Sequence, residues 1–320
     1  MKQQIYHSIE IGLHSKCNLH CPLCTRSKKF FLDNKDHRKF NNELDFEDLK
    51  NAILTIKPQE LKLVGAICEP TMYYKFIELL EFCKEQNISI WLSTNGSYGS
   101  EKFWERVTQA IPKNSVLNFD IDHTQKQLYR KSNTEKIIRN IKIVQKGINP
   151  EDSIRIEALR IEFNWNKDDE KNLEELTKDL GIGLYKIPCY DYNPNEFKED
   201  ISFWDHPKKL YYQKINKLKI LNTKEINCEA LTTNSIYINY LGYIMPCCYI
   251  NDLLLSENIE LYETGIRNKF LNIKDRPIIE EITLNYRNAI DSKDQKIRNY
   301  CSKFCSSFKR KLYKNFKLDP

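Results

Sequence analysis

Three cysteines near the start of the chain, Cys17, Cys21 and Cys24, have the spacing C-x3-C-x2-C. Three thiolates on one short loop can ligate three irons of a 4Fe–4S cluster, which leaves the fourth iron open to another ligand. An open coordination position distinguishes a catalytic metal centre from a structural one. The alternative for this spacing is a zinc site in which His14 or His20 completes the ligand set.

A second group of cysteines lies in the last third of the chain. Cys228 is followed by 13 residues, Gly242, four residues and Cys247, and three residues separate Cys301 from Cys305. Four thiolates can ligate a 4Fe–4S cluster completely, and such a cluster suits electron transfer because it has no open position. Four-cysteine zinc ribbons also use hairpins, so zinc is the alternative here too.

Composition sets further bounds. The chain has 320 residues, of which 41% are hydrophobic, and this balance excludes wholesale disorder. The net charge of +6 is mild for this length, so nucleic acid is not the expected partner. The 11 cysteines are an odd number in a chain without a secretory signal, which argues against a disulfide framework. No apolar run approaches the roughly 18 residues of a membrane span, and we expect a cytoplasmic protein without a membrane partner.

The elements that must position these cysteines alternate between strand and helix. Strands are expected at 5–13, 61–65, 88–93, 116–121, 153–161 and 184–187. Helices are expected at 45–56, 73–86, 101–110, 133–146 and 168–180, with Asp45 placed to cap the first. This alternation predicts an α/β fold with a parallel sheet and helices packed outside it. Six units could form an open doubly wound sheet or a partial (β/α)6 barrel, and in both the C-terminal strand ends carry the site.

The alternation ends at about Pro188, and this end defines the expected domains. Residues 1–190 form the α/β half, and residues 191–225, rich in Tyr, Asn, Pro and charge, form a connector. Residues 226–320 form a small α+β cluster-binding domain, in which 235–239 and 243–245 flank a Leu241-Gly242 turn and predict a hairpin.

Later strand ends carry three further motifs. Gly65-Ala66-Ile67-Cys68-Glu69-Pro70 follows the second expected strand, Thr94-Asn95-Gly96 closes the third, and Asp120-Ile121-Asp122 closes the fourth. Together with the C-x3-C-x2-C loop after the first strand, they resemble the ordered motifs of the radical S-adenosylmethionine (radical SAM) superfamily. The resemblance covers residues 5–190 and implies a partial (β/α)6 barrel of radical SAM type.

The resemblance implies a cofactor site beside the cluster. Cys17, Cys21 and Cys24 would be the catalytic residues that hold the cluster, and S-adenosylmethionine would bind its fourth iron. Reductive cleavage of this cofactor would give a 5′-deoxyadenosyl radical, which takes a hydrogen atom from the substrate. Glu69 would pair with the ammonium group of the cofactor. The other cofactor-binding residues that the motifs imply are Leu23, Gly65, Thr94, Asn95, Asp120 and Asp122.

Two positions depart from the family pattern. Leu23 stands where the family often has an aromatic residue, and Cys68 stands where it usually has glycine. Asp120 and Asp122 are spaced i, i+2, so they would share one face of their strand and could bond the cofactor ribose and the substrate. The alternative is a strand-end cap that is exposed to water.

The four C-terminal cysteines resemble the ligand sets of SPASM and twitch modules, which carry auxiliary clusters. The two-cluster SPASM form needs more cysteines than this region has, so a twitch-like module with one auxiliary 4Fe–4S cluster fits better. The spacing from Gly242 favours Cys247 over Cys248 as a ligand. Two adjacent residues of an extended segment also point in different directions and rarely reach the same cluster.

The resemblance therefore implies a radical SAM oxidoreductase or maturase. It would abstract a substrate hydrogen and oxidise or cross-link a peptide, with the auxiliary cluster as electron acceptor and a flavodoxin-type or ferredoxin-type protein as electron donor. The alternatives are a carbohydrate or aminoglycoside dehydrogenase of the same superfamily, with a small-molecule substrate, and an RNA-modifying radical SAM enzyme. A zinc or iron–sulfur scaffold protein is the non-enzyme alternative.

Overall fold

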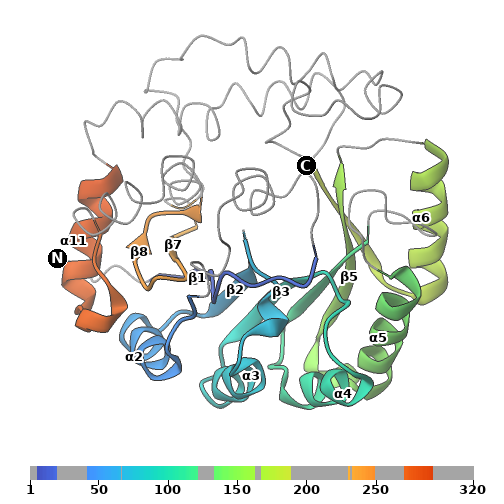
Figure 1. Ribbon diagram of the computed structural model, residues 1–320, viewed down its shortest axis with the longest axis horizontal. Helices are drawn as coiled ribbons and strands as arrows, with labels where there is room; N and C mark the ends of the chain where they lie inside the picture. The colour runs from blue at the N-terminus through green and yellow to red at the C-terminus, as the bar shows by residue number, and fades with distance from the viewer. Residues whose placement is uncertain are drawn as a thin grey trace, which may run out of the picture.

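The computed structural model describes residues 6–19, 42–65, 67–121, 133–162, 167–188, 230, 233–248 and 270–290 (Figure 1). Seven of the predicted site residues lie outside these ranges: Cys21, Leu23, Cys24, Asp122, Cys228, Cys301 and Cys305. No helix within the described ranges is long and apolar enough to cross a membrane.

One eight-stranded sheet organises the described residues, in the order β6-β5-β4-β3-β2-β1-β7-β8. All neighbouring strands are parallel except β7 and β8, which form an antiparallel hairpin. The strands are β1 (Ser8–Ile11), β2 (Glu60–Val64), β3 (Ser89–Thr94), β4 (Val116–Asp120), β5 (Arg155–Glu162), β6 (Gly183–Pro188), β7 (Ser235–Ile238) and β8 (Ile244–Met245). From β1 to β6, strands that are neighbours in the sheet are also consecutive in the sequence, as in a partial (β/α)6 barrel. In a doubly wound sheet the strand order changes direction part-way across the sheet.

Helices connect the parallel strands and lie along the outer side of the curved sheet (Figure 1). The α-helices are α2 (Phe46–Ile56), α3 (Phe76–Glu85), α4 (Glu101–Ala110), α5 (Thr134–Gly147), α6 (Lys167–Leu180) and α11 (Ile279–Ile290). Short 3-10 helices are η2 (Pro70–Met72), η3 (Pro150–Asp152) and η7 (Ile273–Asp275). As predicted, the side chain of Asp45 caps α2 by accepting hydrogen bonds from two backbone N–H groups of its first turn.

The two faces of the sheet differ in chemistry. Successive residues of a strand face opposite sides, and the outward-facing Leu92 and Phe119 are fully buried in the core. Trp104 of α4 packs on Phe119 with ring centroids 5.3 Å apart, which places this face against the helices. The alternate residues Trp91 and Asn118 belong to the inner face of the sheet.

Polar contacts connect the inner face of the sheet across three strands. The Asn118 amide donates to Glu157 Oε2 at 3.1 Å and accepts a hydrogen bond from Trp91 Nε1 at 2.9 Å. Tyr185 of β6 meets the Trp91 ring edge to face at 6.2 Å. The apolar faces of the helices therefore support the sheet from outside, while its inner face carries aromatic and hydrogen-bonding groups.

The hairpin β7–β8 is part of the same sheet. Its antiparallel pairing confirms the predicted hairpin, and β7 also pairs in parallel with β1, so that Ser8 lies opposite Ser235. The sequence alone predicts this hairpin within a separate domain, because pairing between strands so distant in the chain leaves no local pattern. The strand that leads into the first cysteine cluster therefore has β2 on one side and β7 on the other.

Candidate functional site

The C-terminal ends of the first four strands bring the predicted motifs together at one edge of the sheet. Cys17 follows β1, Glu69 follows β2, Asn95 follows β3 and Asp120 ends β4. Parallel pairing places these ends side by side. The segments that follow β1 and β2 are also joined directly, because the Glu69 backbone N–H donates to the Lys16 carbonyl at 2.8 Å.

Glu69 is a buried carboxylate held by four hydrogen bonds. Its side chain belongs to a residue that is only 2% exposed. Oε1 accepts from the hydroxyls of Thr71 (2.6 Å) and Thr94 (2.5 Å) and from the Thr71 N–H (3.3 Å), while Oε2 accepts from the Asn95 N–H (2.8 Å). Burial raises the pKa of Glu69, and the hydrogen bonds from Thr71, Thr94 and Asn95 oppose that rise. The structure thus places Glu69 and two of the predicted cofactor residues in one network.

The Cys17 sulfur lies beside this network and accepts two N–H groups. The Leu19 backbone N–H donates at 3.4 Å, and the Asn95 Nδ2 lies at 3.9 Å. Donors directed at a sulfur stabilise its thiolate form, which is the form that ligates iron. The donor set around Cys17 therefore fits an iron–sulfur ligand, and the adjacent buried Glu69 fits the ammonium of a cofactor.

Two residues outside the predicted set, Asn18 and Ser97, complete this corner of the site. Asn95 Nδ2 donates to Asn18 Oδ1 (2.9 Å), Asn18 Nδ2 donates to Ser97 Oγ (3.0 Å), and Ser97 Oγ donates to Asn95 Oδ1 (2.7 Å). These three residues form a closed ring of hydrogen bonds, which we call the amide ring. Asn18 lies between two of the predicted cluster ligands, and this position in the sequence was the available signal.

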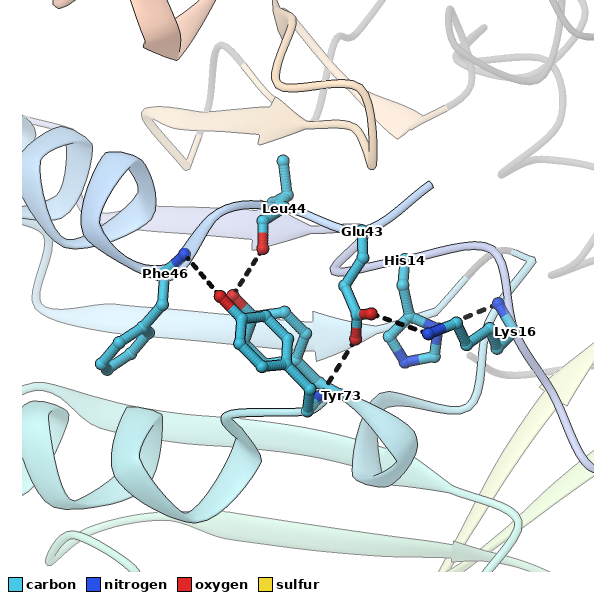
Figure 2. Close-up of polar contacts among 7 residues, drawn as sticks. His14, Lys16, Glu43, Leu44, Phe46 and Tyr73 are labelled. Atoms are coloured by element: carbon cyan, nitrogen blue, oxygen red, sulfur yellow. Dashed lines mark hydrogen bonds and ion pairs between the residues drawn. The ribbon is translucent and has the colours of Figure 1, made fainter. Parts of the chain in front are cut away.

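The residues on either side of the cluster loop are held together at its base. The backbone N–H of Leu44 donates to the Leu13 carbonyl at 2.9 Å. Glu43 then joins three segments: Oε2 pairs with Lys16 Nζ at 2.7 Å, and Oε1 accepts from the Tyr74 N–H at 3.0 Å (Figure 2). Because both sides of segment 17–42 are held at one point, the position of Cys17 is coupled to the loop after β2.

Gly65 and Cys68 explain how the departure from the family pattern is accommodated. A Cβ on Gly65 would lie 2.2 Å from the Cys68 carbonyl oxygen, so this close approach of the backbone requires glycine. The side chain of Cys68 is buried, and burial raises its pKa to about 12. Cys68 is therefore a buried, neutral thiol. Cys83 on α3 is fully buried as well, in line with its prediction as a small hydrophobic residue.

The remaining predicted site residues that the structure describes include Asp120, Cys247 and Cys248. Asp120 is half-buried at the end of β4, on the inner face of the sheet, whereas Asp122 lies outside the described residues, so their shared face stays a prediction. Cys247 and Cys248 are half-buried, but β8 ends at Met245, so the two cysteines are not in the extended segment on which the choice between them rested. That choice stays a prediction based on the spacing alone.

The fold and this edge of the sheet define an α/β partial barrel with its site at the C-terminal strand ends. A family model described as the Radical SAM superfamily matches residues 12–156. Residues 12–156 are therefore similar to the domain of radical SAM enzymes, which use a 4Fe–4S cluster and S-adenosylmethionine. No curated protein matches the chain in sequence.

Solved structures share the fold over nearly the whole chain. SuiB of Streptococcus suis bound to S-adenosylmethionine superposes with a TM-score of 0.62 at 15% identity, over 93% of this chain and 72% of that chain. SuiB bound to the precursor peptide SuiA gives 0.60 at 15% identity, over 95% and 71%. The enzyme anSMEcpe with bound AdoMet and the Kp18Cys peptide gives 0.56 at 16% identity, over 97% and 96%.

Proposed function

We propose that the chain is a radical SAM oxidoreductase or maturase that acts on a peptide. The observation that carries this proposal is the juxtaposition of a buried carboxylate, Glu69, with the hydrogen-bonded sulfur of Cys17. A carboxylate without a basic group among its hydrogen-bond partners is costly to bury. A cationic ligand beside Glu69 supplies the missing charge, and the ammonium group of S-adenosylmethionine is such a ligand.

The residues of the chain bind and orient the reacting groups. Cys17, with Cys21 and Cys24, holds the catalytic cluster, and Glu69 binds the cofactor ammonium. When bound, the cluster and S-adenosylmethionine supply an electron and a 5′-deoxyadenosyl radical that can take a hydrogen atom from an unreactive C–H bond. Thr94 and Asn95 hold the Glu69 carboxylate in place by hydrogen bonds, so the carboxylate is preorganised to bind the cofactor.

The ionisation of Glu69 is part of cofactor binding. Burial raises the pKa of this carboxyl, so the protein without cofactor holds a proton there at a higher pH than an exposed glutamate does. An ammonium group alongside favours the charged carboxylate and displaces that proton. Cofactor binding is therefore expected to release a proton and to strengthen as the pH rises through the pKa of Glu69.

A peptide is the proposed substrate class. Two structures that share the fold hold peptides: SuiB with SuiA, and anSMEcpe with Kp18Cys. The inner face of the sheet carries the half-buried Trp91 and the exposed Tyr185, aromatic side chains that can pack on an extended chain. We further propose that Asp120 faces the cofactor ribose or the substrate from the same edge, together with Asp122.

An auxiliary cluster is proposed for the C-terminal cysteines. Its ligands would be Cys228, Cys247, Cys301 and Cys305, and it would accept the second electron of an oxidation. A flavodoxin-type or ferredoxin-type protein would supply the first electron, in the cytoplasm. Gly242 closes the hairpin at φ +87, a conformation that few residues other than glycine adopt, and this turn directs the chain toward Cys247.

Metal analysis and cofactor cleavage test the proposal. Anaerobic reconstitution should give about eight irons per chain and no zinc, as two cubane clusters require. Alanine at Cys17, Cys21 and Cys24 together should abolish formation of 5′-deoxyadenosine while iron persists at the C-terminal site. Cys83→Ala is the matched control, because Cys83 is buried on α3 and should leave cleavage intact. Zinc without iron would refute the enzyme, and cleavage by the triple variant would refute the ligand assignment.

A further inference from the structure

We infer that Asn95 is a positioning residue for the sulfur of Cys17, rather than a residue that binds S-adenosylmethionine. This inference rests on the proposed function, because it takes Cys17 as a ligand of the catalytic cluster. The motif Thr-Asn-Gly had suggested cofactor binding for Asn95. The hydrogen bonds of its amide point to the cluster loop instead.

The orientation of the Asn95 amide is determined by a backbone donor. Asn95 is 4% exposed, and the backbone N–H of Ser97 donates to its Oδ1 at 2.9 Å. A backbone N–H can only donate, so the atom facing it must be the amide oxygen. The amide nitrogen therefore faces Asn18 and Cys17, and both of its N–H groups have an acceptor there.

The amide ring leaves one N–H group of Asn95 for the sulfur. One N–H donates to Asn18 Oδ1 at 2.9 Å, and this bond closes the ring through Ser97. The amide cannot rotate without breaking the bonds from Ser97 to its oxygen, so the second N–H stays directed at Cys17, at 3.9 Å. The ring also ties Asn18, a residue of the cluster loop, to the turn after β3.

A fixed N–H beside a cluster ligand has a defined chemical effect. Hydrogen bonds to the sulfurs are one of the factors that set the reduction potential of an iron–sulfur cluster. The more negative, reduced cluster gains more from an N–H donor than the oxidised cluster, so the donor raises the potential. Residues that orient a metal ligand in this way also strengthen metal binding. Asn95 should thus make the cluster easier to reduce and easier to assemble.

The test compares Asn95→Ala with Asn140→Ala in the full-length, anaerobically reconstituted protein. Asn140 is the matched control: it is 1% exposed and its amide donates to the Gly96 carbonyl at 2.8 Å, so it supports the same turn without reaching Cys17. The readouts are the midpoint potential of the EPR signal that changes when S-adenosylmethionine is added, and the dissociation constant of the cofactor. Asn95→Asp repeats the test if the alanine variant fails to fold, since it keeps an acceptor for Ser97 but loses the N–H donors.

The inference expects a more negative midpoint potential and a lower iron content in the Asn95 variants, with less than a threefold change in cofactor affinity. Asn140→Ala should reduce thermal stability and leave the potential unchanged. An unchanged potential in both Asn95 variants would overturn the inference, as would an equal shift in Asn140→Ala. A tenfold loss of cofactor affinity at an unchanged potential would also overturn it and would restore Asn95 to the cofactor. If the wild-type protein shows no cluster signal that responds to the cofactor, the proposed function itself fails.

Discussion

Replacing Glu69 by glutamine tests the assignment of the cofactor ammonium most directly. The change preserves the shape of the side chain and removes its charge. A hydrogen bond to a charged group contributes about 1.5–3 kcal/mol. At about 1.4 kcal/mol for each factor of ten, the dissociation constant of S-adenosylmethionine should rise about tenfold to a hundredfold. Titration calorimetry on the anaerobically reconstituted protein measures this change.

The structure also predicts a cost to folding that must be separated from the cost to binding. Both oxygens of Glu69 accept backbone N–H groups, from Thr71 on one side and from Asn95 on the other. A glutamine has one oxygen, so its amide nitrogen must face one of these donors, and a buried donor left without an acceptor costs about 1–3 kcal/mol. Loss of the buried charge offsets part of this cost. The net loss in the free energy of unfolding should therefore be smaller than the loss in binding.

Thr71→Val is the matched control for Glu69→Gln. It removes the hydroxyl that donates to Glu69 at 2.6 Å but leaves the carboxylate and its charge. Its thermal stability should fall by a similar amount, while cofactor affinity falls less than in Glu69→Gln, because the carboxylate charge remains. In the wild-type protein, affinity should rise with pH through the pKa of Glu69 and then level off, and the glutamine variant should lack this dependence. An unchanged dissociation constant in Glu69→Gln, or an equal loss in Thr71→Val, would refute the assignment.

Two further predictions concern the other cysteines. Cys247→Ala should lower the iron content and should still allow cofactor cleavage, but without oxidised product. Cys248→Ala should leave the iron content intact. Metal analysis and product analysis measure these outcomes, and exchanged phenotypes of the two variants would overturn the choice of Cys247 as the ligand. Burial raises the pKa of Cys68 to about 12. Its thiol should therefore resist iodoacetamide in the folded protein at pH 8 and react only after denaturation. Mass spectrometry measures the labelling, and rapid labelling of the native protein would contradict this prediction.

Local signals in the sequence were sufficient for most of the α/β half. The apolar periodicity and the cap at Asp45 predicted α2 correctly, and helix α4 has the predicted bounds. The 3-10 helix η2 was missed because Pro70 begins a short turn that the helical pattern of the next segment hides. The cysteine spacing of the C-terminal region does not predict helix α11, although Pro277 precedes a helical pattern there.

The site was predictable to the extent that its residues belong to motifs. Glu69 and Asn95 lie at adjacent strand ends as predicted, because parallel strands bring their C-terminal ends to one edge. The bonds of Glu43 to Lys16 and to the loop after β2 could not be predicted, since they join segments that meet only in the folded chain. The role of the Asn95 amide was likewise hidden, because its direction depends on the backbone of Ser97.

The pairing of β1 with β7 has a consequence for synthesis of the chain on the ribosome. Ser8 leaves the ribosome well before its partner Ser235, because the two residues are far apart in the sequence. At translation rates of roughly 5–20 residues per second, the N-terminal strand waits about 10–45 s for this neighbour. During that interval its β7-facing edge has unpaired N–H and C=O groups, next to the apolar Ile9 and Ile11. Nascent chains should therefore be most prone to aggregate just before residue 238 leaves the ribosome, and truncations that end before β7 should aggregate more than the complete protein.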